Sequence, residues 1–167
     1  MKTVHLIRHA KSSWNNANLA DVDRTLNHRG QQDCKTMAQP IFEAGCKFES
    51  VYCSIAERAQ MTIQGMSESL TQQNIEWILE EALYTFDDRD LLDWFSNLPD
   101  TLNDVTIVGH NPAITEFTNR LSNRQIANVP TCGYVCIQFP ISTWIDLSKG
   151  SGDCIHFLTP KNLQDTD

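Results

Sequence analysis

Two histidines and two arginines stand at positions in this sequence where together they could bind an anion. Arg8 and His9 follow the first apolar run, Arg58 follows the second and His110 follows the fourth. Two fork-shaped guanidinium groups match the oxygens of a phosphoryl group. Pro112, shortly after the second histidine, predicts a helix start whose free backbone N–H groups point to the same place. These residues therefore predict a pocket for a phosphate-like anion.

The elements that must bring these side chains together are predicted by an alternation of short β-rich runs and longer polar-apolar segments. Such alternation indicates βαβ units, which build a mostly parallel central sheet with helices on both faces, a three-layer α/β/α sandwich. Ligands of such sheets bind at the carboxyl ends of the strands, so we expect three distant segments to meet at one rim. The predicted strands are 3–9, 48–54, 75–79 and 104–110, and the predicted helices are 29–44, 56–70, 90–98 and 112–121.

The last third of the chain has a different pattern. Residues 131–139, 142–147 and 153–160 look like two or three further strands, with the turn-forming run 148–153 before the last of them. We expect them to form an antiparallel extension of the sheet. Pro40 lies inside the first predicted helix, where a proline kinks or ends the helix.

The composition indicates one ordinary globular domain, predicted to span residues 1–167. The formal net charge of −8 argues against nucleic acid or an anionic membrane surface as partner, although a local cluster of cations can still hold one phosphate. The sequence shows neither an export signal nor an apolar run of roughly 18 to 20 residues. Its six cysteines form no CxxC pair. We expect a cytoplasmic protein with reduced thiols, and a monomer is favoured.

A metal site is the main alternative interpretation of paired histidines. His5 and His9 would lie about 13 Å apart along a strand, too far to share one ion. His9 and His110 could share a metal, but two neighbouring arginines without a supporting carboxylate cluster would repel a dication. No metal is therefore predicted. The sequence also lacks the glycine-rich motifs of nucleotide sites and the GxSxG motif of serine hydrolases.

Four motifs, in order along the chain, resemble those of the histidine phosphatase superfamily, the phosphoglycerate mutase-like group. "RHAKSSWN" (8–15) resembles the RHG signature and is typical of the small SixA-type branch of phosphohistidine phosphatases. "DRTLNHRG" (23–30) is similar to D-x-x-L-x-x-x-G, "SIAERAQMT" (54–62) to S-x-A-x-R-A-x-x-T, and "VGHNPAI" (108–114) to the second-histidine motif. The tail "IHFLTPKNL" (155–163) also resembles the SixA-type C-terminus. The resemblance covers most of the chain and implies the phosphoglycerate mutase-like fold.

Carried over to this sequence, the resemblance implies a role for each residue of the predicted pocket. His9 is the nucleophile that becomes transiently phosphorylated, while Arg8, Arg58 and His110 hold the phosphoryl oxygens. Asn15, at the position of the family's asparagine, is a further candidate phosphate ligand. A neutral imidazole can attack phosphorus without losing a proton, provided that another group fixes its tautomer through the second ring nitrogen. The resemblance implies neither a metal nor another cofactor.

The sequence departs from the wider family in two places. Ala10 replaces the usual glycine, a change that SixA-type members share. Other branches carry a glutamate after the third strand as general acid; here Glu81 is our first choice, with Asp87, Asp88 and Glu80 as alternatives. A leaving group of low pKa, such as the imidazole of phosphohistidine, needs less proton donation than a sugar alcohol. A weak or missing acid therefore fits a phosphoramidate substrate.

The predicted function is that of a metal-independent phosphatase with a phosphohistidine intermediate, which removes phosphate from a histidine of a partner protein. One alternative is a phosphatase of small phosphorylated metabolites or of phosphoserine and phosphothreonine. A second alternative is a non-catalytic phosphate-binding module that keeps the pocket without turnover.

Overall fold

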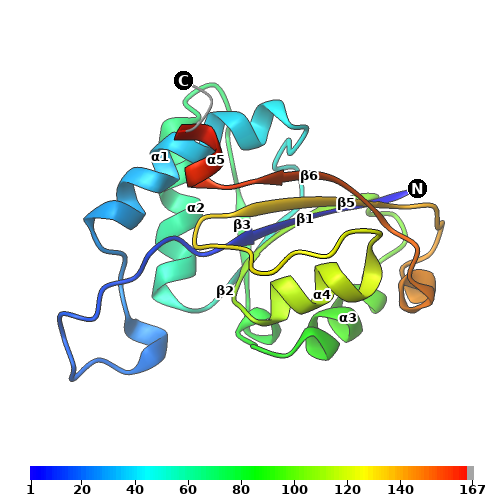
Figure 1. Cartoon of the computed structure of the whole chain (residues 1–167), viewed down its shortest axis with the longest axis horizontal. Helices are drawn as coiled ribbons and strands as arrows, with labels where there is room; N and C mark the ends of the chain where they lie inside the picture. Colours follow the sequence, from blue (N-terminus) through cyan, green and yellow to red (C-terminus); the bar gives the residue numbers. More distant parts are fainter. Residues whose placement is uncertain (165–167) are drawn as a thin grey trace.

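A six-stranded sheet forms the centre of the protein, as Figure 1 shows for the computed structural model. The structure describes residues 1–164, so the last three residues of the predicted domain lie outside it. The strand order is β3-β2-β4-β1-β5-β6. The strands are β1 (Lys2–Arg8), β2 (Val51–Ser54), β3 (Trp77–Glu80), β4 (Asp104–Gly109), β5 (Tyr134–Phe139) and β6 (Asp153–Leu158).

The first four strands are parallel and the last two extend the sheet with antiparallel pairings. β1 pairs with β4, β4 with β2 and β2 with β3 in parallel, whereas β5 runs antiparallel to β1 and β6 antiparallel to β5. The predicted mostly parallel sheet with an antiparallel C-terminal extension is therefore confirmed.

Helices cover both faces of the sheet, which completes the predicted three-layer sandwich (Figure 1). α1, α2 and α5 lie on one face, and α3 and α4 lie on the other. The short 3-10 helices η1 to η3 lie in the connections. The bounds are η1 (Asp21–Asp23), α1 (His28–Glu43), α2 (Glu57–Ser69), η2 (Glu81–Leu83), α3 (Asp88–Ser96), α4 (Ala113–Leu121), η3 (Trp144–Lys149) and α5 (Pro160–Gln164).

The core of residues 1–164 consists of two hydrophobic clusters, one under each helical layer. Ile7 of β1 packs into the cluster that contains Met37 and Ile63 of α1 and α2. Its neighbour Leu6 packs into the other cluster, with Phe117 of α4. Successive side chains of a strand point to opposite faces, so a strand that is covered on both sides must be apolar almost throughout. This is why the centre of β1 is apolar apart from His5, which is hydrogen-bonded through both ring nitrogens.

The structure differs from the expectation for residues 142–147, where it has the 3-10 helix η3 rather than a strand. The reason is the fully buried side chain of Trp144, whose indole N–H donates to the Leu102 carbonyl at 2.9 Å. Its backbone N–H donates to Asp100 Oδ1 at 2.8 Å. Pro40 lies inside α1, and the helix continues past it to Glu43.

The sheet topology places three strand ends side by side at one rim. β4 lies between β1 and β2, and all three run in the same direction. Arg8 pairs with Gly109, and the His9 N–H donates to the Gly109 carbonyl at 3.0 Å. The residues that follow β1, β2 and β4 therefore meet at the carboxyl edge, as predicted.

The loop between β1 and α1 is fastened beside this rim at the start of α1. The Asn27 side chain caps the helix by accepting from the Gly30 N–H at 2.8 Å, and the Asn27 N–H donates to the Lys11 carbonyl at 3.0 Å. A Cβ at Gly30 would lie 2.2 Å from that same carbonyl oxygen. Only glycine allows this close approach, which explains the glycine of "DRTLNHRG".

Candidate active site

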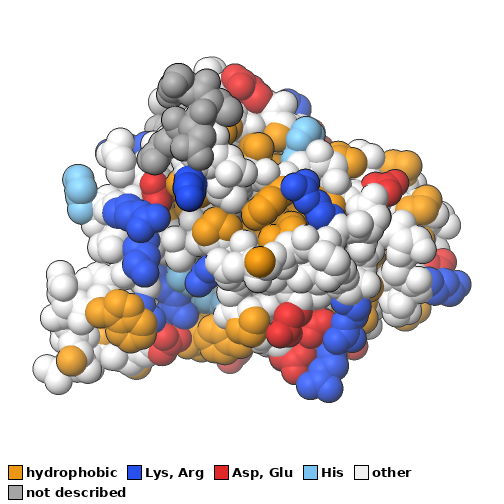
Figure 2. Space-filling view, viewed as in Figure 1, with side chains coloured by type: hydrophobic (Ala, Val, Ile, Leu, Met, Phe, Trp, Pro, Cys, Tyr) orange, Lys and Arg blue, Asp and Glu red, His pale blue; other side chains and the backbone are white. Residues whose placement is uncertain are grey.

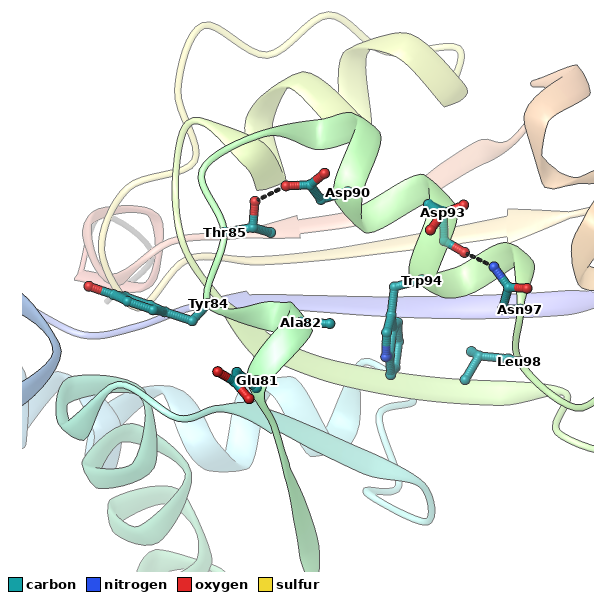
Figure 3. A pocket seen from close by; sticks show the side chains of 9 residues that line it. All are labelled: Glu81, Ala82, Tyr84, Thr85, Asp90, Asp93, Trp94, Asn97 and Leu98. Carbon is teal, nitrogen blue, oxygen red and sulfur yellow. Dashed lines mark hydrogen bonds between the residues drawn. The ribbon is translucent and has the colours of Figure 1, made fainter.

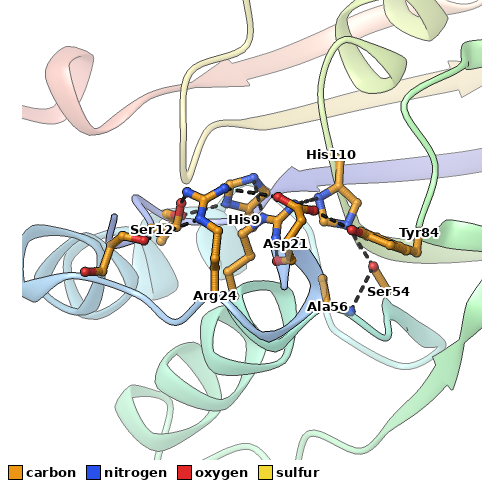
Figure 4. Close-up of polar contacts among 11 residues, drawn as sticks. His9, Ser12, Asp21, Arg24, Ser54, Ala56, Tyr84 and His110 are labelled. Carbon is orange, nitrogen blue, oxygen red and sulfur yellow. Dashed lines mark hydrogen bonds and ion pairs between the residues drawn. The ribbon is translucent and has the colours of Figure 1, made fainter. Parts of the chain in front are cut away.

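His9 lies directly after β1, and its two ring nitrogens have different partners (Figure 4). Nδ1 donates its proton to the Ala10 carbonyl at 2.7 Å. Nε2 is then the unprotonated nitrogen, and it faces the Nε–H of Arg58 at 3.4 Å. The backbone therefore fixes the tautomer that leaves a lone pair on Nε2.

The surroundings of His9 keep its imidazole neutral. The pKa of His9 is lowered to about 4, chiefly by burial; the backbone bond to Ala10 raises the pKa, and the positive charges of Arg58 and Arg8 lower it. The residue nevertheless keeps 8% exposure and is not sealed from solvent. A neutral, oriented imidazole beside cationic side chains is suited to attack a phosphoryl group.

Arg58 in the first turn of α2 is the centre of the hydrogen-bond network. Besides Nε near His9, its Nη2 lies 3.5 Å from Nδ1 of His110. Nη1 donates to the Asp21 carbonyl at 2.6 Å, and Nη2 donates to Asp21 Oδ2 at 3.0 Å. Thr62 ties this turn to the nucleophile loop, because its hydroxyl donates to the Arg58 carbonyl at 2.7 Å and accepts from the Ala10 N–H at 2.9 Å.

His110 follows β4 and lies opposite His9, with 5.2 Å between the ring centroids. Its Nε2 lies 2.7 Å from the hydroxyl of Ser54, and that hydroxyl accepts the Ala56 N–H at 3.3 Å. This contact orients the imidazole and leaves Nδ1 facing Arg58 and the site. The pKa of His110 is lowered to about 3, first by burial, then by the charge that His9 gains at low pH and by the charge of Arg58.

Arg8 supplies a second guanidinium beside the nucleophile. Its Nη1 donates to the Val129 carbonyl at 2.9 Å, whereas its Nε is buried without a hydrogen-bond partner in the described part of the chain. Burial and the neighbouring charge of Arg58 both lower the pKa of Arg8. An anion would relieve the repulsion between the two arginines and supply an acceptor.

Asp21, which the sequence analysis missed, brings a carboxylate to the same network. Its Oδ1 accepts from Arg24 Nη1 at 3.2 Å, and its Oδ2 accepts from both Arg58 and the Tyr84 hydroxyl. Burial raises the pKa of Asp21, but the hydrogen bonds from Tyr84 and Arg58 outweigh it and lower the pKa to about 2. Figure 4 shows this carboxylate between Tyr84 and His9.

The site contains further residues that the sequence analysis did not single out: Ser54, Arg24 and Tyr84. Ser54 and Arg24 lie inside the quoted motifs 54–62 and 23–30, where nothing about their types indicates a role. Tyr84 and Asp21 lie outside those motifs, and only the fold brings them together.

The structure does not bring Glu81 or Glu80 to the nucleophile. Glu81 is exposed and lines a separate hollow of about 520 Å³ between η2 and α3, where Thr85 donates to Asp90 (Figure 3). Tyr84 borders this hollow but directs its hydroxyl away from it. Glu80 caps η2 by accepting from the Ala82 N–H at 3.4 Å.

The remaining two acids have partners elsewhere, and Asn15 is exposed. Asp87 caps α3 and pairs with Arg89 at 2.8 Å, while Asp88 pairs with Arg120 at 2.7 Å. Asn15 bonds through its backbone N–H to the Ser13 hydroxyl at 3.1 Å. Within residues 1–164, none of the four predicted acids has a hydrogen bond or ion pair with the two site histidines.

The described residues contain neither a metal-binding cluster nor a membrane-spanning helix. No three side chains of His, Cys, Asp or Glu among them are grouped so that they could hold a metal ion. None of the helices within this part of the chain has the length and apolarity needed to cross a bilayer.

Comparison with known families agrees with the arrangement at the rim. The profile of the histidine phosphatase superfamily (branch 1) matches residues 4–94, more than half of the chain. The chain belongs to this superfamily, as its motifs predicted. The matched part contains His9, Arg58 and Asp21, while His110 lies beyond it.

Individual relatives cover different shares of the chain. The 2,3-bisphosphoglycerate-dependent phosphoglycerate mutase of Brucella ovis is 37% identical over 92 residues, which are 54% of this chain and 45% of the mutase. The chain thus spans less than half the length of that relative.

Two solved structures resemble almost the whole chain. The protein histidine phosphatase SixA in complex with tungstate matches 96% of this chain and 99% of its own, with a TM-score of 0.78 and 18% identity. A protein assigned as the phosphohistidine phosphatase SixA of Agrobacterium tumefaciens matches 95% of this chain over 98% of its own length, with a TM-score of 0.77 and 21% identity. At these identities the similarity establishes a shared fold.

Proposed function

We propose that this protein is a phosphatase that forms a phosphohistidine intermediate on His9 and that its substrates are phosphohistidines of partner proteins. The observation that carries the proposal is the orientation of His9, whose Nδ1 is bound to the Ala10 carbonyl while Nε2 faces Arg58. Membership of the histidine phosphatase superfamily supports the reaction class.

The reaction consists of two displacements at phosphorus. In the first, the Nε2 lone pair of His9 forms a bond to phosphorus, and the bond to the leaving group breaks with its electron pair. In the second, a water oxygen attacks phosphorus, the P–N bond breaks, and its electron pair returns to Nε2. Arg58, Arg8 and His110 stabilise the charge on the equatorial oxygens in both steps.

The surface around the site supports a protein substrate. Trp14, Leu19 and Phe86 are 73%, 39% and 47% exposed, and the Phe86 ring lies 5.4 Å from that of His110. Figure 2 shows cationic side chains and a histidine in a hollow beside the loop after β1, with hydrophobic side chains on both sides. Exposed apolar side chains around a polar pocket are typical of surfaces that bind another protein. A protein substrate also agrees with the shared fold of SixA, whose tungstate complex is described as that of a protein histidine phosphatase.

The reaction class is tested with His9→Ala and p-nitrophenyl phosphate. We expect His9→Ala to abolish turnover, while the exposed His28→Ala control retains it. Because the proposed reaction uses no metal, a chelator should leave the rate of the unmodified protein unchanged. Activity that persists in His9→Ala would refute the assignment.

The substrate class is tested by comparing rates on a phosphohistidine protein, a phosphoserine peptide and a sugar phosphate. We expect the highest kcat/KM on the phosphohistidine protein. A preference for the sugar phosphate or the phosphoserine peptide would favour the alternative phosphatase classes. An acid-labile radiolabel on the protein after exposure to substrate would exclude the non-catalytic phosphate-binding module.

A further inference from the structure

The leaving group of a phosphate ester needs a proton. The carboxylate of Asp21 is hydrogen-bonded to Arg58, whose guanidinium faces the nucleophile His9. Asp21 accepts two bonds from Arg58, one to its backbone carbonyl and one to Oδ2, while Nε of the same guanidinium faces His9. The side chain of Asp21 is 46% exposed, so a bound substrate can reach it. None of the four acids named from the sequence has such a contact among the described residues.

We propose that Asp21 donates the proton to the leaving group and afterwards accepts one from the attacking water. The proposal rests on the proposed function, since it assigns the proton transfer of the reaction at His9. It differs from the sequence-based choice of Glu81, which lines the separate hollow beside α3.

Electrostatics explains how a carboxylate that is ionised in the free protein can become the acid. Arg58 from α2, Arg24 from the loop before α1 and the hydroxyl of Tyr84, which directly follows η2, face Asp21 and hold it ionised. His110, directly after β4, is close enough for the charge of Asp21 to raise its pKa.

A phosphoryl group on His9 would share the Arg58 guanidinium with Asp21. Two anions held by one cation favour uptake of a single proton between them. Substrate binding therefore converts Asp21 from a carboxylate into a proton donor.

The proton and electron balance closes over the two steps. The proton enters with the substrate monoanion, because the second pKa of a phosphate ester is about 6. As His9 Nε2 bonds to phosphorus, the P–O bond to the leaving group breaks and that oxygen takes the proton of Asp21. The Asp21 carboxylate then accepts a proton from the water that attacks phosphohistidine. It passes this proton to the departing phosphate, which leaves as the monoanion, so that Asp21 is again ionised. The net change is ester plus water to alcohol plus phosphate.

The test compares Asp21→Asn with the unmodified protein on phosphate esters whose leaving groups differ in pKa. The quantity measured is kcat/KM, which reports the phosphorylation of His9. We expect a loss of less than about tenfold with p-nitrophenyl phosphate and a loss of roughly 10²- to 10⁴-fold with an alkyl phosphate, the usual range for general acid catalysis. Asp21→Glu should restore part of the alkyl phosphate rate.

The matched control is Asp23→Asn, which removes the same charge from the same 3-10 helix. Asp23 is exposed, and its carboxylate has no hydrogen bond or ion pair in the described part of the chain, so both substrates should be hydrolysed at the unmodified rate. An equal loss on both substrates in Asp21→Asn would show that Asp21 only positions Arg58, and an equal gain would show that it only blocks the pocket. Either result would overturn the proposal. Retention of turnover in His9→Ala would instead refute the proposed function itself.

Discussion

The neutral state of His9 leads to a quantitative prediction for the pH dependence of phosphorylation. An ordinary histidine is half protonated at pH 6.5, whereas a pKa of about 4 leaves roughly one His9 in 300 protonated there. The nucleophile should therefore be fully available from about pH 5 upward. We expect the ionisation of His9 to limit kcat/KM only as the pH falls through about 4.

The cause of the low pKa is tested by Arg58→Met, which removes one positive charge beside the ring. Because burial is the larger cause and the charge of Arg58 a smaller one, the pKa of His9 should rise in this variant without reaching 6.5. The direct measurement is an NMR titration of labelled histidine rings, in which the His9 signal is assigned by its loss in His9→Gln. The kcat/KM profile must be corrected for ionisation of the substrate.

The same shift fixes the sign of the stability change. The unfolded chain binds a proton at His9 near pH 6.5, but the folded chain binds it only near pH 4. Stability should therefore fall as the pH decreases from 6.5 to 4, by about 1.4 kcal/mol per pH unit at most for this one group. An NMR midpoint for His9 at pH 6 or above, or an unchanged midpoint in Arg58→Met, would contradict the reasoning.

Two further predictions concern residues around the site. Ser54→Ala removes the 2.7 Å contact to His110 Nε2. In steady-state assays it should lower kcat/KM about fivefold, which corresponds to one neutral hydrogen bond of about 1 kcal/mol. An unchanged kcat/KM would mean that Ser54 does not orient the His110 ring. Gly30→Ala would place a Cβ 2.2 Å from the Lys11 carbonyl oxygen and should reduce the free energy of unfolding by about 1–3 kcal/mol in urea titrations. Unfolding curves that coincide with those of the unmodified protein would refute the packing argument.

The position of Asp21 shows why part of the site escapes sequence reasoning. The segment "ADVDRTL" contains two aspartates, and no periodicity or motif indicates which of them faces Arg58. Only the packing of η1 against the first turn of α2 and against Tyr84 distinguishes Asp21 from Asp23.

The fold contains a similar case in its last third. Residues 142–147 have the composition of a strand, but burial of Trp144 against Phe95, with ring centroids 5.8 Å apart, forms a short helix there. Local propensity is weak, so one large buried side chain can override it.

The sequence by itself determined the order of the elements, the class of the fold and the meeting of His9, Arg58 and His110 at one rim. It could do so because alternating apolar runs specify parallel strands, and the carboxyl ends of neighbouring parallel strands must share an edge. The tertiary structure alone decided which carboxylate lies beside the nucleophile and which ring nitrogen is free. The choice of carboxylate and the free nitrogen of His9 depend on hydrogen bonds between residues remote in sequence or on the exact backbone path. Neither feature produces a periodic pattern of residue types in the sequence.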